Sequence, residues 1–178
     1  MKLTAQGWLS GVRRVASPNH DARPPKTAVE LLVIHNISLP PTEYGGNAIE
    51  RFFTNTLDHS EHPFYEQIKG VRVSSHFLVR RDGQIVQFVP SNKRAWHAGI
   101  STWRGRSRCN DFSIGIELEG CDFEPFTDRQ YHTLARLTRR LKRIYPIRDI
   151  VGHSDIAPER KTDPGPFFDW ERYAARLK

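Results

Sequence analysis

Two histidines and one aspartate occupy positions from which they could bind a metal ion together. His35 and His153 each follow a run of apolar residues and each precedes a polar loop that contains proline. Asp163 lies ten residues beyond His153, beside the turn-forming pair Pro164 and Gly165. Because α/β proteins gather active-site groups at the carboxyl ends of their strands, we expect the three side chains to meet at one edge of a sheet.

Two imidazoles and one carboxylate form a donor set that suits zinc. Three protein ligands leave a fourth position for water, and a catalytic zinc ion lowers the pKa of that water to about 7. We therefore expect one catalytic zinc ion per chain, held by His35, His153 and Asp163. On spacing alone, the alternative for each histidine is a buried ring whose nitrogens bond to backbone carbonyls.

Lys161 and Glu117 carry charges that could act beside such a metal. If residues 161–163 are extended, Lys161 lies on the same side as Asp163, and its ammonium could stabilise the oxyanion formed when water attacks an amide. Glu117 is a candidate general base, since the attacking water loses a proton and the departing nitrogen gains one. The alternatives are a surface lysine and a solvent-facing carboxylate.

The apolar patterns predict the strands that would position these groups. Residues 29–35 are almost continuously apolar, which predicts a strand buried on both faces. Residues 74–89 predict a hairpin with a two-residue turn around Asp82 and Gly83. Residues 113–119 alternate in type, which predicts one packed face and one face that carries carboxylates.

The remaining elements complete a mixed α/β fold. Thr127 is a plausible N-cap for a long helix that Pro146 terminates. We expect helices at 47–55, 127–145 and 169–177, and a short strand at 150–153. Strands that alternate with helices indicate a mixed β-sheet flanked by helices.

Length and composition favour one domain. With 178 residues, of which 38% are hydrophobic, the chain can bury one substantial core. We expect a single domain over residues 1–178, with residues 1–28 packing on it as an extension. The start of the chain lacks the apolar run of a signal peptide, and Cys109 and Cys121 lack C-x-x-C spacing. These features predict a cytoplasmic protein with free thiols, without a membrane partner.

The net charge of +7 leaves a nucleic-acid protein as one alternative. A basic helix face supports that alternative through four arginines, Arg136, Arg139, Arg140 and Arg143. Solvated basic helix faces are common, however, and no nucleic-acid recognition motif accompanies this one. We therefore expect no nucleic-acid partner.

Five blocks of the sequence together resemble the type 2 N-acetylmuramoyl-L-alanine amidases, a family related to the peptidoglycan recognition proteins. The resemblance runs in order from about Gly7 to Trp170. The blocks are Leu31 to Pro41, Ser75 to Gly83, Ala95 to Gly99, Asn110 to Gly120 and Gly152 to Gly165. The resemblance implies the fold of that family and zinc-dependent hydrolysis of the amide between N-acetylmuramic acid and L-alanine.

The resemblance also implies roles for particular residues. His35, His153 and Asp163 would bind zinc, Glu117 would activate water and Lys161 would stabilise the oxyanion. Many relatives have a tyrosine and a cysteine where this chain has Ser75 and Asp163, which leaves Glu117 as the expected base. The complete ligand set argues against the alternative, a non-catalytic peptidoglycan-binding module.

The substrate implied is a muropeptide whose sugar is 1,6-anhydro-N-acetylmuramic acid, a fragment from peptidoglycan recycling. Stem peptides carry several carboxylates, so Arg72 and Arg108 are expected to bind them. Asn36 and Trp96 are expected to contact backbone and sugar, although a turn residue and a core residue are the alternatives. Residues 38–46 and 100–108 could form mobile walls of the cleft. No obligate protein partner is expected.

Overall fold

A six-stranded mixed sheet forms the centre of the protein in a computed structural model that describes residues 2–178. The strand order is β1-β5-β4-β9-β3-β10, in which β4 and β5 are antiparallel and the other neighbouring pairs are parallel. The strands are β1 (Arg13–Arg14), β3 (Leu31–Ile37), β4 (Phe77–Val79), β5 (Ile85–Gln87), β9 (Ser113–Glu119) and β10 (Asp149–Gly152). A mixed sheet was expected, and the structure has one.

The two longest strands, β3 and β9, lie side by side at the middle of the sheet. Their register pairs Leu31 with Ser113 and continues to Ile37 with Glu119. The sequence predicts a packed face and a carboxylate-bearing face for β9, but all seven of its residues are buried. The second face is covered because the ring of His97 packs against Gly115 and because Arg80 pairs with both Glu119 and Glu50, so its polar side chains are enclosed rather than solvated.

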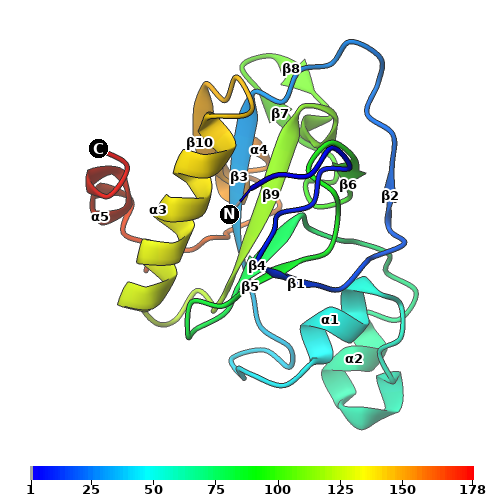
Figure 1. Cartoon of the computed structure of the whole chain (residues 1–178). Helices are drawn as coiled ribbons and strands as arrows, with labels where there is room; N and C mark the ends of the chain where they lie inside the picture. The colour runs from blue at the N-terminus through cyan, green and yellow to red at the C-terminus, as the bar shows by residue number, and fades with distance from the viewer. Residues whose placement is uncertain (1) are drawn as a thin grey trace.

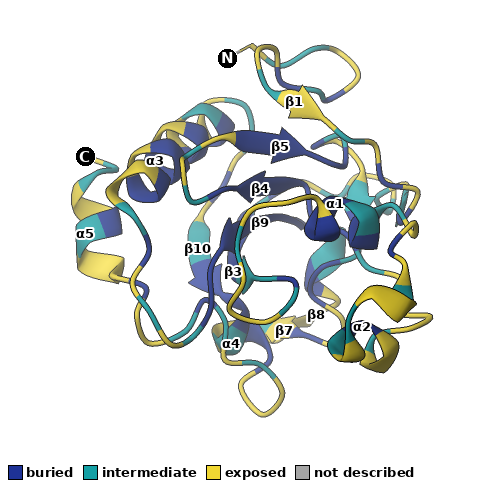
Figure 2. Ribbon diagram, turned by 90° about the horizontal axis from the view of Figure 1, so that it is seen from below, coloured by how far each residue is buried: buried dark blue, intermediate teal, exposed yellow. Residues whose placement is uncertain are grey.

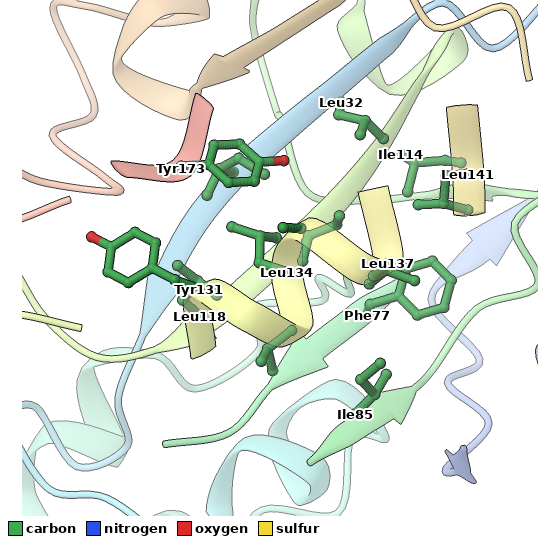
Figure 3. Packing of buried hydrophobic residues seen from close by; sticks show 14 of the residues in the cluster. Leu32, Phe77, Ile85, Ile114, Leu118, Tyr131, Leu134, Leu137, Leu141 and Tyr173 are labelled. Carbon is green, nitrogen blue, oxygen red and sulfur yellow. The ribbon is translucent and has the colours of Figure 1, made fainter. Parts of the chain in front are cut away.

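One face of the sheet is covered by α3 (Asp128–Lys142) and α5 (Trp170–Ala175), as Figure 1 shows. The helix α3 begins with a capping box, in which Thr127 accepts from the backbone of Gln130 and the Gln130 side chain accepts from Thr127 N. Leu134, Leu137 and Leu141 of α3 then pack against Ile114 and neighbouring strand residues (Figure 3). This layer is the larger apolar core.

The other face carries short elements. Helices α1 (Ala48–Phe53) and α2 (Pro63–Gln67) cover it near β4 and β5, and Figure 2 shows them on the side of the sheet opposite α3. Helix α4 (His153–Ile156) follows β10 directly. The smaller elements are η1 (His59–Glu61), η2 (Cys109–Asp111), the pair β2 (His20–Asp21) and β6 (Arg94–Ala95), and the pair β7 (Thr102–Trp103) and β8 (Arg106–Ser107).

Three local predictions need correction. His153 is the first residue of α4 rather than the end of a strand, because β10 stops at Gly152, whose N–H is accepted by Asp155 Oδ2 at 2.7 Å. The strand β3 continues two residues beyond His35. The hairpin has a three-residue loop, since Arg80 donates to Gln84 O at 2.9 Å and Gly83 takes φ +85°. Such a loop places glycine in the left-handed conformation.

Residues 2–28 run along the sheet edge and over the core. Strand β1 pairs with β5, and Leu9 is fully buried in the larger core cluster. Arg23 donates to four backbone carbonyls, those of Asn110, Asp111, Ser91 and Ser113.

Among residues 2–178, no helix is long and apolar enough to cross a membrane.

Candidate active site

The three predicted ligands converge at the end of the sheet where β3 meets α4. His35 Nδ1 lies 3.0 Å from His153 Nδ1 and 2.9 Å from Asp163 Oδ2, and His153 Nδ1 lies 3.1 Å from Asp163 Oδ2. Both histidines are buried, and the aspartate is nearly so. Three donor atoms that belong to separate parts of the chain therefore form one small triangle.

The hydrogen bond made by His153 Nε2 shows which ring nitrogen of His153 is available to bind a metal. His153 Nε2 lies 3.1 Å from the carbonyl oxygen of Ala98. A carbonyl only accepts, so Nε2 carries the proton, and in the neutral ring Nδ1 presents a lone pair to Asp163 and His35. This is the tautomer that a metal ligand requires.

The protonation states of His35 and Asp163 also suit a metal ion. Burial lowers the pKa of His35 to about 4, although the hydrogen bond to Asp163 opposes this effect. Burial raises the pKa of Asp163, but hydrogen bonds with His153 and His35 outweigh burial and leave it below its ordinary value. Neutral imidazoles and an ionised carboxylate are the forms that bind metal.

The spacing of the donor atoms passes a further test. A tetrahedral zinc ion with bonds of about 2.0–2.1 Å holds its ligand atoms roughly 3.3 Å apart. The three separations here, 2.9, 3.0 and 3.1 Å, are close to that value. A search of residues 2–178 for three or more His, Cys, Asp or Glu side chains close enough to bind one metal ion finds this triangle.

The triangle lies at the base of a cleft of about 580 Å³. Its lining combines polar side chains, among them Glu117, Asp122 and Lys161, with apolar side chains from α1, α2 and the loops around them. The apolar lining residues are Ile37, Leu39, Pro41, Phe52, Phe53, Phe64, Ile68, Val71, Val73, Cys121 and Phe123. A cleft of this kind can bind a ligand with a polar centre and an apolar flank.

Glu117 lies beside the metal ligands. It is the register partner of His35 in the parallel β3–β9 pair, so the two side chains lie on the same face of the sheet. Burial and the charge of Asp163 raise the pKa of Glu117 well above its ordinary value, while Lys161 opposes the rise. Glu117 is 7% exposed, which excludes the solvent-facing carboxylate that was the alternative.

Lys161 and Asn36 also line the cleft. Lys161 lies two residues before Asp163 and is half-buried. Asn36 Nδ2 donates to Asp122 Oδ1 at 2.6 Å and to Pro164 O at 3.1 Å, which leaves the Asn36 carbonyl oxygen as its free acceptor. Both residues are placed where a substrate could touch them.

The other three predicted substrate residues lie outside the described cleft lining. Arg72 is exposed beside a smaller pocket formed by residues 52–72. Arg108 is mostly exposed and faces Asp111 at 3.4 Å. Trp96 is half-buried, and its backbone N–H donates to Ser74 Oγ at 3.1 Å. A role for these residues in binding therefore stays a prediction.

The two predicted mobile walls differ. Ser38, Leu39 and Pro41 line the cleft, and Gly45 N donates to Glu119 Oε1 at 2.8 Å, which fastens the end of residues 38–46 to β9. Residues 100–108 form the β7–β8 ribbon, and none of them belongs to the cleft lining described for residues 2–178. Whether either segment moves stays a prediction.

Sequence reasoning missed several residues that support the site. His97 Nδ1 lies 3.0 Å from His35 Nε2, and Arg160 donates to Ala98 O at 3.0 Å. Arg80 bridges Glu119 and Glu50 at 2.9 and 2.8 Å within the protein interior. Residues Ala95 to Gly99 form one of the blocks that carry the family resemblance. The sequence of this block does not reveal which residue its histidine, His97, contacts.

Comparison with known proteins identifies the class to which this fold and site belong. Residues 25–166 match the family model described as N-acetylmuramoyl-L-alanine amidase. The chain therefore belongs to the N-acetylmuramoyl-L-alanine amidase family, and the expected enzyme class is confirmed. The metal triangle and Glu117 all fall within the matched residues.

Within this family the chain is very similar to AmpD. It is 59% identical over 173 residues to 1,6-anhydro-N-acetylmuramyl-L-alanine amidase AmpD of Escherichia coli K12, covering 96% of this chain and 94% of the relative. The crystal structure of a Se-Met AmpD derivative matches with a TM-score of 0.97 and 56% identity, and all of both chains is covered. These similarities confirm the expected fold and family.

A more distant structure contains a ligand. It is the complex of the Escherichia coli amidase AmiD with the substrate anhydro-N-acetylmuramic acid-L-Ala-D-γ-Glu-L-Lys. That structure matches with a TM-score of 0.61 and 32% identity, covering 98% of this chain and 65% of AmiD. A related fold therefore binds an anhydromuropeptide.

Proposed function

We propose that this protein hydrolyses the amide bond between 1,6-anhydro-N-acetylmuramic acid and L-alanine in muropeptides, as a zinc-dependent step of peptidoglycan recycling. The observation that carries the proposal is the triangle of His35, His153 and Asp163 beside the buried carboxyl of Glu117. The similarity to AmpD over nearly the whole chain supports the anhydro sugar as the substrate class.

Zinc is the metal that the donor set favours. Two imidazole nitrogens and one carboxylate oxygen, provided by His35, His153 and Asp163, give a net ligand charge of −1, which leaves a divalent ion partly positive. When bound, zinc supplies a Lewis acid that polarises the amide carbonyl and makes water a better nucleophile. The three ligands leave one position open for that chemistry.

Glu117 moves the proton in the proposed reaction. Its carboxylate takes a proton from the attacking water, and the same proton then passes to the amide nitrogen as the C–N bond breaks. A buried carboxyl suits this role, because its raised pKa lets it hold the proton between the two steps. The products are the free sugar acid and a peptide with a free L-alanine amino group.

Lys161 and the proposed substrate residues act through charge and position. The ammonium of Lys161, which lines the cleft, stabilises the negative oxygen of the tetrahedral intermediate. Asn36 offers its carbonyl oxygen to a substrate N–H. Arg72 and Arg108 bind carboxylates of the stem peptide, and Trp96 contacts the sugar; these three roles require the substrate to extend beyond the described cleft.

The proposal also covers the domain organisation of the protein, its cellular location and its partners. Residues 1–178 act as one amidase domain that includes residues 1–28 as an extension; the pairing of β1 with β5 and the burial of Leu9 support this. The enzyme works in the cytoplasm on imported wall fragments, a setting that agrees with two buried free cysteines, Cys109 and Cys121. Its partner is the anhydromuropeptide, and no nucleic acid, membrane or obligate protein partner takes part.

A cleavage assay tests the proposed function. Purified protein carrying one zinc ion is incubated with an anhydromuropeptide and, separately, with the same peptide on ordinary N-acetylmuramic acid, and products are identified by mass spectrometry. Release of a peptide with an L-alanine amino terminus from the anhydro substrate, lost with a chelator and restored by zinc, is expected. Tight binding without cleavage would favour a peptidoglycan-binding module instead.

A further inference from the structure

A third buried histidine, His97, faces the metal ligands from outside the triangle. Its Nδ1 lies 3.0 Å from Nε2 of His35, on the opposite side of the His35 ring from the metal-facing Nδ1. Its own Nε2 lies 3.1 Å from Ser113 Oγ. Both ring nitrogens of His97 are therefore occupied by protein groups, which leaves neither nitrogen available for substrate or metal.

The hydrogen-bond directions along this chain follow from the free lone pair that His35 must present. A neutral His35 whose Nδ1 binds metal carries its proton on Nε2, so it donates to Nδ1 of His97. His97 then carries its proton on Nε2 and donates to the hydroxyl of Ser113. His35 and His97 then each have one donor nitrogen and one acceptor nitrogen, and each of these four ring nitrogens has a partner.

The backbone around His97 holds the second ligand as well. The N–H groups of His97 and Ala98 both donate to Asn110 Oδ1, at 3.1 and 2.8 Å. The carbonyl of Ala98 accepts from His153 Nε2 at 3.1 Å and from Arg160 at 3.0 Å. The dipeptide His97–Ala98 thus contacts the outer nitrogen of both histidine ligands.

Strand β9 makes space for the ring of His97. A Cβ atom at Gly115 would come within 2.5 Å of His97 Cγ, which is closer than any real side chain can pack. Gly115 and Ser113 lie on the same face of β9, so one residue makes room for the ring and the other binds its far nitrogen. The site is therefore built for a histidine at position 97.

We propose that His97 is a positioning residue of the metal site: by accepting the His35 Nε2 proton it fixes the tautomer and ring plane that aim His35 Nδ1 at the metal. The proposal rests on the proposed zinc site. Because His97 is a neutral acceptor rather than a carboxylate, it orients His35 without adding negative charge to the donor set. The bound metal accordingly remains a strong Lewis acid.

A matched pair of variants tests this role through zinc affinity, measured by competition with a chromophoric chelator. His97→Asn keeps an acceptor bonded to Cγ, whereas His97→Leu has nearly the same shape as asparagine and no acceptor. We expect His97→Leu to weaken zinc binding by about 10–100-fold and His97→Asn to recover most of that loss. Equal zinc affinity in wild type and both variants would overturn the proposal.

Two controls separate a positioning role from a general loss of structure. His76 is also fully buried and its ring packs against that of His97, but its nitrogens bond to Gly115 N, Lys93 O and the Arg23 guanidinium, at 3.1, 3.0 and 3.2 Å, and not to a metal ligand. His76→Asn should lower the melting temperature and leave zinc affinity unchanged. If wild type itself binds no zinc, the proposed function fails; if wild type binds zinc and His76→Asn weakens it as much as His97→Leu does, only the positioning role fails.

A spectroscopic readout checks the same bond directly. In zinc-loaded protein with ¹⁵N-labelled histidine, Nδ1 of His97 should show the chemical shift of an unprotonated nitrogen and Nε2 that of a protonated one. The reverse assignment would show that His97 donates to His35, which would contradict the proposal.

Discussion

The two faces of strand β9 have very different chemistry. Ile114, Ile116 and Leu118 belong to the larger apolar cluster with residues of α3, and Figure 3 shows Ile114 and Leu118 beside that helix. On the other face, Ser113 and Gly115 accommodate His97, Glu117 enters the cleft, and Glu119 holds Arg80. Both faces are buried, so the difference lies in what each face encloses.

This comparison separates stability from function within seven residues. The apolar face stabilises the fold through burial, and its side chains have no role in the reaction. The polar face buries histidines and carboxylates that cost free energy to desolvate, and the cost is offset by hydrogen bonds and, in the proposed zinc-loaded enzyme, by the metal. Substitutions on the two faces should therefore change different measured quantities.

Loss of the metal should have the largest effect. Dialysis against a strong chelator is expected to abolish amidase activity, and added zinc should restore it, because the carbonyl then regains its Lewis acid. His35→Ala should abolish activity in a way that zinc does not rescue. Amide cleavage followed by chromatography measures both. Full activity in His35→Ala would show that the reaction does not depend on the triangle.

Replacement of the buried carboxyl should come next. Glu117→Gln keeps shape and hydrogen-bonding capacity but cannot carry the proton, so kcat should fall by about 10²–10⁴-fold. Bound zinc, measured by atomic emission, should stay at the wild-type level. A variant that retains near-normal kcat with zinc bound would show that Glu117 is not the base.

The same substitution should alter the pH dependence of stability in metal-free protein. Burial raises the pKa of Glu117 above its ordinary value of 4.5, so the unfolded chain ionises this carboxyl first as pH rises. Wild-type stability is therefore expected to fall relative to Glu117→Gln as pH rises above about 4.5. Melting temperatures at pH 4 and pH 7.5 check this; a difference that does not change with pH would mean that the carboxyl is well solvated.

On the apolar face, Ile116→Ala should lower the stability of the protein and leave its activity unchanged. Ile116 is fully buried in the core cluster, so its truncation should lower the free energy of unfolding by about 2–5 kcal/mol. Zinc affinity and kcat should stay at their wild-type values when the protein is folded. Urea unfolding and the cleavage assay measure the two quantities. A large fall in kcat would mean that the faces are coupled.

The smallest effect is expected from the helix cap. Thr127→Ala removes the side-chain oxygen that accepts from Gln130 N at 3.2 Å, and should cost about 1 kcal/mol. Thr127→Ser is the matched control, because it keeps that oxygen. Since α3 lies behind the sheet, neither variant should change zinc affinity. Equal unfolding free energies in Thr127→Ala and Thr127→Ser would show that the cap does not stabilise α3.

The sequence predicts the apolar face better than the polar one, for physical reasons. Local patterns predict strand β3 and helix α3. The strand follows from a continuous apolar run, and the helix from an N-cap threonine followed by apolar residues three and four positions apart. The two histidine donors were predicted from residue type and position near strand ends, and Asp163 from its place beside a proline–glycine turn ten residues after His153. Their actual meeting required only that two parallel strands and one loop end at the same place.

The support around the ligands could not be predicted in this way. The contact between His35 and His97 joins residues 62 positions apart, and it depends on the missing Cβ of Gly115. The bridge from Arg80 to Glu50 and Glu119 also links three separate elements. Arg72 and Arg108 show the converse: the resemblance proposes them as peptide-binding residues, but local pattern cannot place them in the cleft.

The position of zinc in a crystal of the metal-loaded protein tests the central claim most directly. Anomalous diffraction recorded on both sides of the zinc absorption edge locates the ion without reference to activity. We expect one peak per chain at about 2.0–2.2 Å from His35 Nδ1, His153 Nδ1 and an Asp163 carboxylate oxygen. A zinc ion bound elsewhere, or an active enzyme crystal without zinc at these three atoms, would contradict it.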